Sequence, residues 1–415
     1  MKAYLVGGAV RDALMGRAST DRDWVVVGST PEAMARAGFT PVGRDFPVFL
    51  HPETKEQYAL ARTERKTAAG YRGFAFHADP TVTLEEDLAR RDLTINAMAL
   101  DPQGALIDPF NGKSDLEGHV LRHVSAAFSE DPVRILRLAR FAARYADFTV
   151  AAPTLALARQ MVEAGEVDAL VPERVWQELA RGLLEVRPSR MLSVLSDCGA
   201  LSRLLPELER SWRAHSPMAD QSKLSARDHV DRSVNRAAGL GADLPTRFAC
   251  LTHEINDAPV PSAAGTRSSQ GTTAAKVALD RLCERLRVPA DCRDMAHIVT
   301  REYDQVQRCE SLESEAVLGL LERCDALRRP ERFEAALLAC ECIARGWPET
   351  AHRHYPQRQV LRSALRRALE VDSTAVAARA IGRGLLGPAI GQAIHAARVS
   401  AIAQSPDPAA PARPV

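Results

Sequence analysis

The sequence predicts an α+β protein in which a small head with a mixed sheet and helices is followed by an elongated, all-α remainder. Two observations carry this prediction. Short runs rich in β-branched residues alternate with helical segments up to about residue 125. From Asp131 to beyond residue 380, Leu and Ala recur at spacings of three and four residues, the period of an amphipathic helix. The chain has 415 residues, enough for two to four domains or one long helical array.

In the head, the pattern predicts four short strands and two helices. The strands are expected at residues 4–6, 24–27, 48–50 and 58–60, and the helices at 31–37 and 84–88. Residues 70–73 show no periodicity and are expected to form a flexible loop.

The helical remainder has three clear starting signals. Asp131-Pro132 combines a capping carboxylate with a proline in the first turn, and Pro172-Glu173 and Pro188-Ser189 are further starts. The last residues, 405–415, contain four prolines and are expected to be disordered.

Composition limits the class of protein. The net charge is +1, so any contact with nucleic acid must come from local basic patches. No apolar stretch is long enough to span a bilayer, and Met1-Lys2 leads directly into a strand rather than a signal peptide. The 8 cysteines form no Cys-x-x-Cys pair, so we expect reduced, buried thiols and a cytoplasmic protein without a membrane partner.

Two aspartates separated by one residue, Asp21 and Asp23, precede the run Val25-Val26-Val27. Side chains alternate along a strand, so both carboxylates are expected on one face. Two such groups repel one another unless a cation lies between them, and Mg²⁺ prefers oxygen ligands. The preceding Gly7-Gly8 turn would let the backbone approach a phosphate chain closely. Alone, Asp-x-Asp is common on solvated strands, but this combination favours metal-assisted phosphoryl transfer.

A second group of charged motifs follows. Arg90-Arg91-Asp92 is expected at a helix–strand junction, and residues 108–112 form an Asp-Pro-Phe-Asn-Gly turn. Four charged residues then recur every three positions and trace an oblique stripe on one helix. They are Asp131, Arg134, Arg137 and Arg140. Neighbouring arginines repel one another, so the stripe is either a capped, solvated helix face or a site for an anion or a base.

Together these segments closely resemble the class II tRNA nucleotidyltransferases, the bacterial CCA-adding enzymes, whose head is shared with bacterial poly(A) polymerases. Five motifs occur in the family's order. They are Gly7-Gly8-x-x-Arg11-Asp12, Asp21-x-Asp23, Arg90-Arg91-Asp92, Asp108-Pro109-x-Asn111-Gly112 and Glu130-Asp131-x-x-Arg134. The resemblance is dense over the first 145 residues and looser to about residue 330.

The resemblance implies addition of CCA to the 3′ end of tRNA from CTP and ATP. Asp21 and Asp23 would be the catalytic ligands of Mg²⁺, which would help to deprotonate the RNA 3′-hydroxyl and steady the pyrophosphate. The other implied residues contact the incoming nucleotide, with Asp131 and Arg134 acting as a protein template and Arg137 and Arg140 lying along the cleft. The implied nucleotide-binding set is Gly8, Arg11, Arg91, Asp131, Arg134, Arg137 and Arg140. Glu64 is a weaker candidate for a third acidic group, and a surface role is favoured for it.

The implied domains are a nucleotidyltransferase head (1–140), a nucleotide- and RNA-binding neck (141–225), a degenerate HD-like helical domain (226–330) and a tRNA-binding tail (331–404). Many relatives carry a metal-dependent phosphohydrolase in the third of these regions. Here His229, His253 and Asp304 echo it, but Glu254 replaces the aspartate of the dyad. Its extra methylene would displace the carboxylate, so we expect the fold without the activity.

Three other functions are compatible with parts of the sequence. A poly(A) polymerase has the same head, but a strongly basic C-terminal extension is missing, and the segment 45–47 looks more like the CCA-adding branch. A non-catalytic RNA-binding protein is disfavoured because both aspartates and the motif arginines are present. A metal phosphohydrolase is disfavoured by Glu254. The sequence leaves open whether the protein is a monomer or a homodimer.

Overall fold

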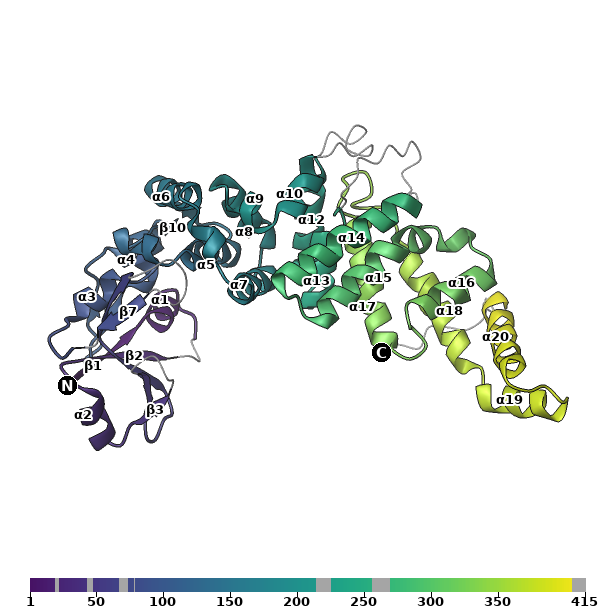
Figure 1. The fold of residues 1–415 in the computed structure, drawn as a ribbon, viewed down its shortest axis with the longest axis horizontal. Helices are drawn as coiled ribbons and strands as arrows, with labels where there is room; N and C mark the ends of the chain where they lie inside the picture. The colour runs from purple at the N-terminus through teal and green to yellow at the C-terminus, as the bar shows by residue number, and fades with distance from the viewer. Residues whose placement is uncertain are drawn as a thin grey trace. The chain divides into compact units, whose positions relative to one another are not determined.

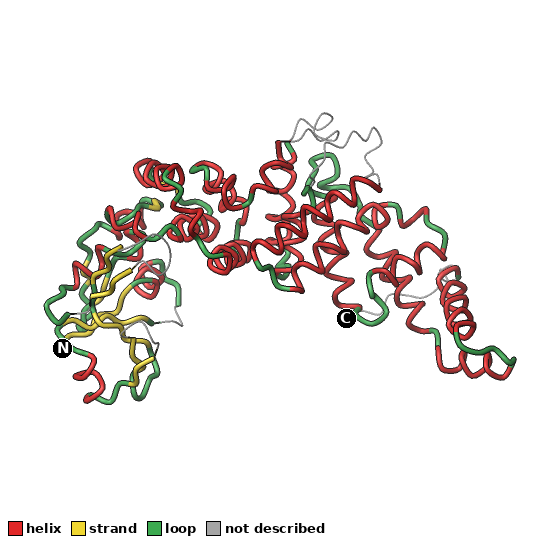
Figure 2. Tube along the Cα trace, viewed as in Figure 1, coloured by secondary structure: helices red, strands yellow, loops and turns green. Residues whose placement is uncertain are grey.

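The computed structural model describes residues 1–18, 22–42, 48–66, 74–77, 79–213, 225–255 and 269–404 (Figure 1). The chain divides into two compact units, Met1–Pro206 and Glu207–Val415. Several sequence predictions lie outside the described residues: those for Asp21, the side chain of Glu64, and the segments 45–47, 70–73 and 405–415. Strands occur in the first unit, and the described part of the second is helical (Figure 2). The predicted α+β class is confirmed.

The head is built on a mixed seven-stranded sheet with the order β3-β4-β5-β2-β1-β8-β9. Its strands are β1 (Lys2–Val6), β2 (Asp23–Val27), β3 (Thr40–Val42), β4 (Val48–Leu50), β5 (Gln57–Leu60), β8 (Ala99–Leu100) and β9 (Leu106–Ile107). β2 and β5 are parallel, and the other neighbours are antiparallel. All four predicted strands are present. Two further pairs form outside this sheet: β6 (Thr63–Lys66) with β7 (Phe74–His77), and β10 (Val120–Leu121) with β11 (Thr149–Val150).

The register of β1 and β2 brings two motifs together. Val6, the last residue of β1, lies opposite Asp23, the first residue of β2. The glycine turn that follows Val6 is therefore next to the Asp23 carboxylate. The valines of β2 alternate between two cores: Val25 packs with Val6 and Leu88, whereas Val26 packs with Met34 and Phe49 on the other face. Burial of these valines fixes the face on which Asp23 lies.

The helices of the head are α1 (Gly8–Leu14), α2 (Pro31–Arg36), α3 (Leu84–Ala89) and α4 (Gly112–Glu117). Thr30 caps α2, and Thr83 forms a capping box with Glu86 at the start of α3. The expected strand directly after Arg90-Arg91-Asp92 was wrong, because these residues lead into the 3₁₀ turn η1 (Thr94–Asn96). Burial of all three η1 side chains competes with an extended conformation there.

Gly112 is needed to seat η1 against α4. An added Cβ would lie 2.9 Å from Met98 Cγ and closer still to the carbonyl oxygen of Thr94. We predict that Gly112→Ala destabilises the protein by about 1–3 kcal/mol, the usual cost of overpacking. Urea unfolding measures the change. Gly239→Ala is the matched control, because nothing lies within 4 Å of its added Cβ; equal stability of both variants would contradict the prediction.

The first unit continues with helices α5 (Val133–Arg144), α6 (Ala152–Glu163), α7 (Pro172–Leu184), α8 (Pro188–Asp197) and α9 (Ala200–Leu204). The three predicted helix starts are confirmed, and Oδ1 of Asp131 accepts a hydrogen bond from the backbone N–H of Val133 at 3.1 Å. α5 packs against both α7 and α8. Its buried face includes Ile135, Leu138 and Phe141.

The second unit is an array of helices. They are α10 (Pro206–Arg213), α12 (Ala226–Gly239), α13 (Leu244–Thr252), α14 (Ser269–Leu286), α15 (Ala290–Gln307), α16 (Ser314–Arg323), α17 (Pro330–Ala344), α18 (Gln357–Glu370), α19 (Ser373–Gly382) and α20 (Pro388–Ala403). All eight cysteines are buried and free, as predicted. Among the described helices, none is long and apolar enough to cross a membrane. The finer domain boundaries given above remain predictions.

Candidate active site

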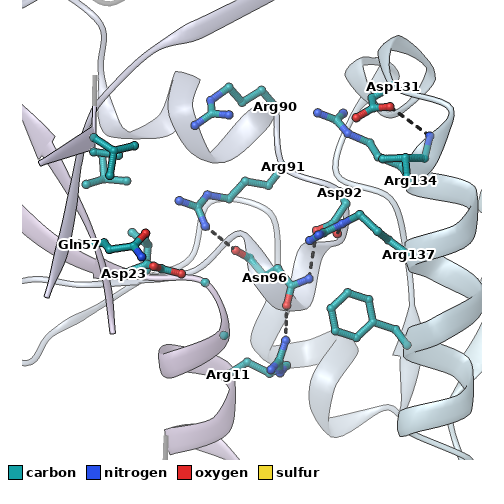
Figure 3. Close-up of a pocket in the computed structure, with 18 of the residues that line it drawn as sticks. Arg11, Asp23, Gln57, Arg90, Arg91, Asp92, Asn96, Asp131, Arg134 and Arg137 are labelled. Atoms are coloured by element: carbon teal, nitrogen blue, oxygen red, sulfur yellow. Dashed lines mark hydrogen bonds and ion pairs between the residues drawn. The ribbon is translucent and has the colours of Figure 1, made fainter. Parts of the chain in front are cut away.

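A pocket of about 630 Å³ lies in the first unit, between the strands β1, β2 and β5 and the helices α5 and α7. Its volume falls in the range of small-ligand sites. Seven arginines and four acidic residues line it. They are Arg11, Arg62, Arg90, Arg91, Arg134, Arg137 and Arg174, with Asp23, Asp92, Asp131 and Glu178. This excess of positive charge suits a polyanion such as a nucleoside triphosphate. Figure 3 shows Asp23 and Gln57 on the strand side, and Asp131, Arg134 and Arg137 on the facing helical side.

Most of the predicted site residues meet in this pocket. Those that line it are Gly8, Arg11, Asp23, Arg91, Asp131, Arg134 and Arg137. Asp21 lies outside the described residues. Arg140 is not among the lining residues; its guanidinium Nε donates to Glu178, which is, at 2.7 Å.

The glycine turn approaches an arginine closely. Gly7 has φ 71°, and a Cβ added there would lie 3.0 Å from Nη1 of Arg91. Both the left-handed conformation and this approach require glycine. Arg91 thus lies next to the backbone of Gly7, and Arg11 lies next to Gly8, so the first and second motifs form one wall of the pocket.

Asp87 anchors the arginines of the second motif. Its side chain is fully buried and accepts hydrogen bonds from Arg90 at 2.6 Å and from Arg91 at 3.3 Å. Burial opposes ionisation, but the two guanidiniums outweigh it and lower the pKa of Asp87. Asp87 was missed in the sequence, although its spacing of three and four residues from the two arginines is the signature of helical ion pairs.

A chain of hydrogen bonds crosses the floor of the pocket from α1 to α5 (Figure 3). Nη1 of Arg11 donates to Oδ1 of Asn96 at 2.5 Å, and Nδ2 of Asn96 donates to Oδ1 of Asp92 at 3.0 Å. Nε of Arg137 donates to Oδ2 of Asp92 at 2.8 Å. Burial alone would raise the pKa of Asp92, but Arg137 and Asn96 lower it to about 2. Asp92 in turn raises the pKa of Arg137.

The stripe on α5 is neither a solvated face nor a set of repelling arginines. Nη1 of Arg134 donates to the carbonyl oxygen of Ala127 at 2.5 Å. Arg137 is held by Asp92, Arg140 by Glu178, and Asp131 by Arg174. Acidic residues of the protein therefore offset the repulsion between these arginines, and binding of an anion or a base at the stripe stays a prediction. The sequence did not reveal these partners because they come from other segments.

Asp23 is the acidic lining residue that suits a metal. Asp23 is exposed, whereas Asp92 and Glu178 are only 6% exposed and form ion pairs with arginines. Carboxylate oxygens are ligands that Mg²⁺ prefers. Within the described ranges no group of three or more His, Cys, Asp or Glu side chains lies close enough to hold a metal. Asp23 can contribute one oxygen donor to a metal.

Two histidines that were predicted to echo a phosphohydrolase motif, His229 and His253, are buried in the second unit. His229 is 2% exposed, with Nδ1 2.8 Å from Oε1 of Glu254 and Nε2 2.7 Å from the carbonyl oxygen of Ile343. Its ring stacks on Trp347 with centroids 4.2 Å apart. Because both ring nitrogens already have partners, His229 has a structural role here. His253 lies beside Tyr303, with ring centroids 4.4 Å apart.

Comparisons with known proteins match this arrangement. Residues 3–122 match the family described as the Poly A polymerase head domain, and residues 147–211 match a probable RNA- and SrmB-binding site of polymerase A. The multifunctional CCA protein of Leptothrix cholodnii is 57% identical over 408 residues, covering 98% of this chain and 97% of that protein. The chain belongs to the multifunctional CCA protein family. The family member from Variovorax paradoxus is 54% identical over 418 residues, covering 98% of this chain and 100% of that protein.

Solved structures support the fold of the family. The CCA-adding enzyme of Bacillus stearothermophilus in complex with CTP has a TM-score of 0.65 and 23% identity, covering 96% of this chain and 88% of that one. The enzyme of Thermotoga maritima complexed with tRNA has a TM-score of 0.64 and 22% identity, covering 98% and 88%. At these identities the likeness shows the fold.

Proposed function

We propose that this protein adds C, C and A to the 3′ end of tRNA from CTP and ATP, releasing pyrophosphate, without a nucleic-acid template. The observation that carries the proposal is the pairing of two walls in one pocket. An exposed carboxylate, Asp23, faces a helical wall with an acidic acceptor, Asp131, and a cationic donor, Arg134. The first wall suits nucleotidyl transfer and the second suits base selection.

The arginine-rich floor suits the triphosphate. Arg11 and Arg91 flank the turn at Gly8, where backbone and guanidinium donors can bind phosphate oxygens. Arg137 lies between this floor and the helical wall and is fixed by Asp92. Arg140 acts on the pocket indirectly. It forms an ion pair with Glu178, which lines the pocket, and so fixes α7 against α5.

Base selection follows from hydrogen-bond chemistry. A carboxylate accepts from the exocyclic amine of C or A, while a guanidinium donates to ring acceptors. U and G present a carbonyl where C and A carry the amine. One pair, Asp131 and Arg134, could therefore accept both wanted nucleotides and reject the other two.

The proposed cofactor is Mg²⁺, held by Asp23 and Asp21. When bound, the metal supplies positive charge that stabilises the negative charge developing on the transferring and leaving groups. The protein itself holds the triphosphate on Arg11 and Arg91 and presents the base to the helical wall.

Poly(A) polymerase is the less favoured alternative. The head family carries that name, but relatives that match essentially the whole chain at 54–57% identity are CCA proteins. The proposed partners are tRNA, ATP and CTP, the proposed location is the cytoplasm, and the choice between monomer and homodimer stays open.

Primer extension tests the proposal. Purified protein receives a tRNA transcript lacking its last three nucleotides, with Mg²⁺ and CTP, ATP or both. We expect two additions with CTP alone and a third, final one once ATP is present. Long adenosine tails with ATP alone would assign the protein to the polymerase branch instead.

The packed state of His229 gives a separate prediction. With Mg²⁺, Mn²⁺, Ni²⁺ or Co²⁺ added, the protein should release no phosphate from phosphate esters above the rate without protein, because both ring nitrogens of His229 are occupied. Colorimetric phosphate release measures this. Metal-dependent release that disappears in His229→Ala would contradict the prediction.

A further inference from the structure

The guanidinium of Arg174 binds the carboxylate of Asp131 through both of its terminal nitrogens. Nη2 lies 2.7 Å from Oδ2 and Nη1 lies 3.2 Å from Oδ1. This bidentate geometry is the strongest form of an arginine–carboxylate contact. The two side chains are only 25% and 20% exposed, so water screens the pair less than a surface ion pair.

The remaining contacts of Asp131 leave it one acceptor position. An ionised carboxylate offers about four lone-pair positions and no donor. Two positions on Oδ1 accept from Val133 and Arg174, and one on Oδ2 accepts from Arg174. One position on Oδ2 is left, on a side chain that lines the pocket. A single oriented acceptor suits the amine of C or A and repels a carbonyl oxygen at the same place.

The helix that carries Arg174 is itself fixed. One turn later, Glu178 on α7 forms an ion pair with Arg140 of α5 at 2.7 Å, and both side chains are about one-tenth exposed or less. Two ion pairs thus join α7 to α5 and to Asp131, which lies two residues before α5. Arg174 is therefore held at a defined distance from Asp131.

The geometry points to Arg174 as a positioning residue for nucleotide selection, which fixes the Asp131 carboxylate with one acceptor turned to the incoming base. This inference rests on the proposed function, in which Asp131 selects the nucleotide. Without Arg174, only the Val133 N–H would hold the carboxylate, and its oxygens could turn away from the base.

The test measures kcat/KM for CTP and for UTP separately, on a tRNA lacking CCA. We expect Arg174→Ala to lower the preference for CTP over UTP by about tenfold or more, the lower end of what one good base contact contributes. Arg174→Lys keeps the positive charge but loses the paired nitrogens of the guanidinium. Its preference for CTP over UTP should therefore fall between those of the wild type and Arg174→Ala. Arg203→Ala, which breaks a half-exposed pair with Asp168, is the matched control and should keep the wild-type preference.

The outcomes distinguish a failure of the role of Arg174 from a failure of the proposed function. An equal loss of rate with all nucleotides, or an unchanged preference in Arg174→Ala, would overturn the role of Arg174. If Arg174→Ala does not fold, the preference of Arg174→Lys decides by the same criterion. Wild-type protein that fails to add C, C and A would instead refute the proposed function itself.

Discussion

Replacing Asp23 with Asn should lower kcat for nucleotide addition by about a thousandfold or more, which corresponds to about 4 kcal/mol of transition-state stabilisation. The carboxylate is one of the two proposed ligands of Mg²⁺, and a neutral amide holds a divalent cation poorly. Because Asp23 is exposed at the start of β2, the change should leave the fold intact. Removing divalent metal from the wild-type protein with a chelator should lower kcat for nucleotide addition by a similar factor.

Single-turnover addition and tRNA binding by filter retention measure the two effects separately. We expect tRNA binding within a few-fold of wild type. Asp147→Asn is the control, since it removes a carboxylate from an exposed pair with His119 in the same unit. Retention of more than a tenth of the wild-type rate by Asp23→Asn would remove Asp23 from the catalytic role.

The second large effect is expected at Asp92, on stability as well as activity. Asp92→Asn would leave Arg137 without its carboxylate partner in a site where the Asp92 side chain is 6% exposed. Breaking a fully buried charge pair costs about 3–5 kcal/mol. Here the Arg137 side chain is 37% exposed, so water offsets part of the loss and we expect a destabilisation of about 2 kcal/mol. We expect this shift in the free energy of unfolding in urea, together with loss of nucleotide addition.

The pKa of Asp92 also fixes the pH range of this contribution. It is lowered from an ordinary value of 3.8 to about 2. Stability from a depressed carboxyl pKa is complete above the unfolded value and is lost as the pH falls through the folded value. Asp92 should therefore contribute about 2 kcal/mol above pH 3.8, declining toward pH 2.

Unfolding of wild type and Asp92→Asn across this range measures the difference, with Asp147→Asn as an exposed control. The free-energy gap between wild type and Asp92→Asn should narrow on acidification. A gap of less than about 1 kcal/mol at neutral pH, the value of a surface pair, would show that the network is not structurally important.

Local patterns in the sequence were sufficient for four of the seven strands of the main sheet, for the helices α2 and α3, and for the positions of the motifs. The β-branched run after Asp23 and the Pro-led helix starts depend on neighbouring residues alone, so they could be predicted. The partners of the charged side chains could not. Asn96 is 85 residues from Arg11, and Arg174 is 43 residues from Asp131. Such pairs exist because the sheet register and helix packing bring distant segments together.

The ion pairs of the α5 stripe were missed for the same reason. Repulsion among Arg134, Arg137 and Arg140 was inferred from one helix considered alone. In the folded protein Asp92 and Glu178, from other segments, balance two of these charges. The order of family motifs predicted the site residues, most of which line the pocket, whereas the hydrogen-bond chain between them required the three-dimensional structure.

The central claim is that protein side chains choose the nucleotides and the stopping point. Sequencing the 3′ ends of tRNA transcripts lacking CCA, after incubation with all four nucleoside triphosphates together, tests it most directly. We predict that the products end in CCA and extend no further, and that Asp131→Ala and Arg134→Ala products contain misincorporated U or G or stop early. Uniform adenosine tails, or ends of mixed sequence from the wild-type protein, would contradict the claim.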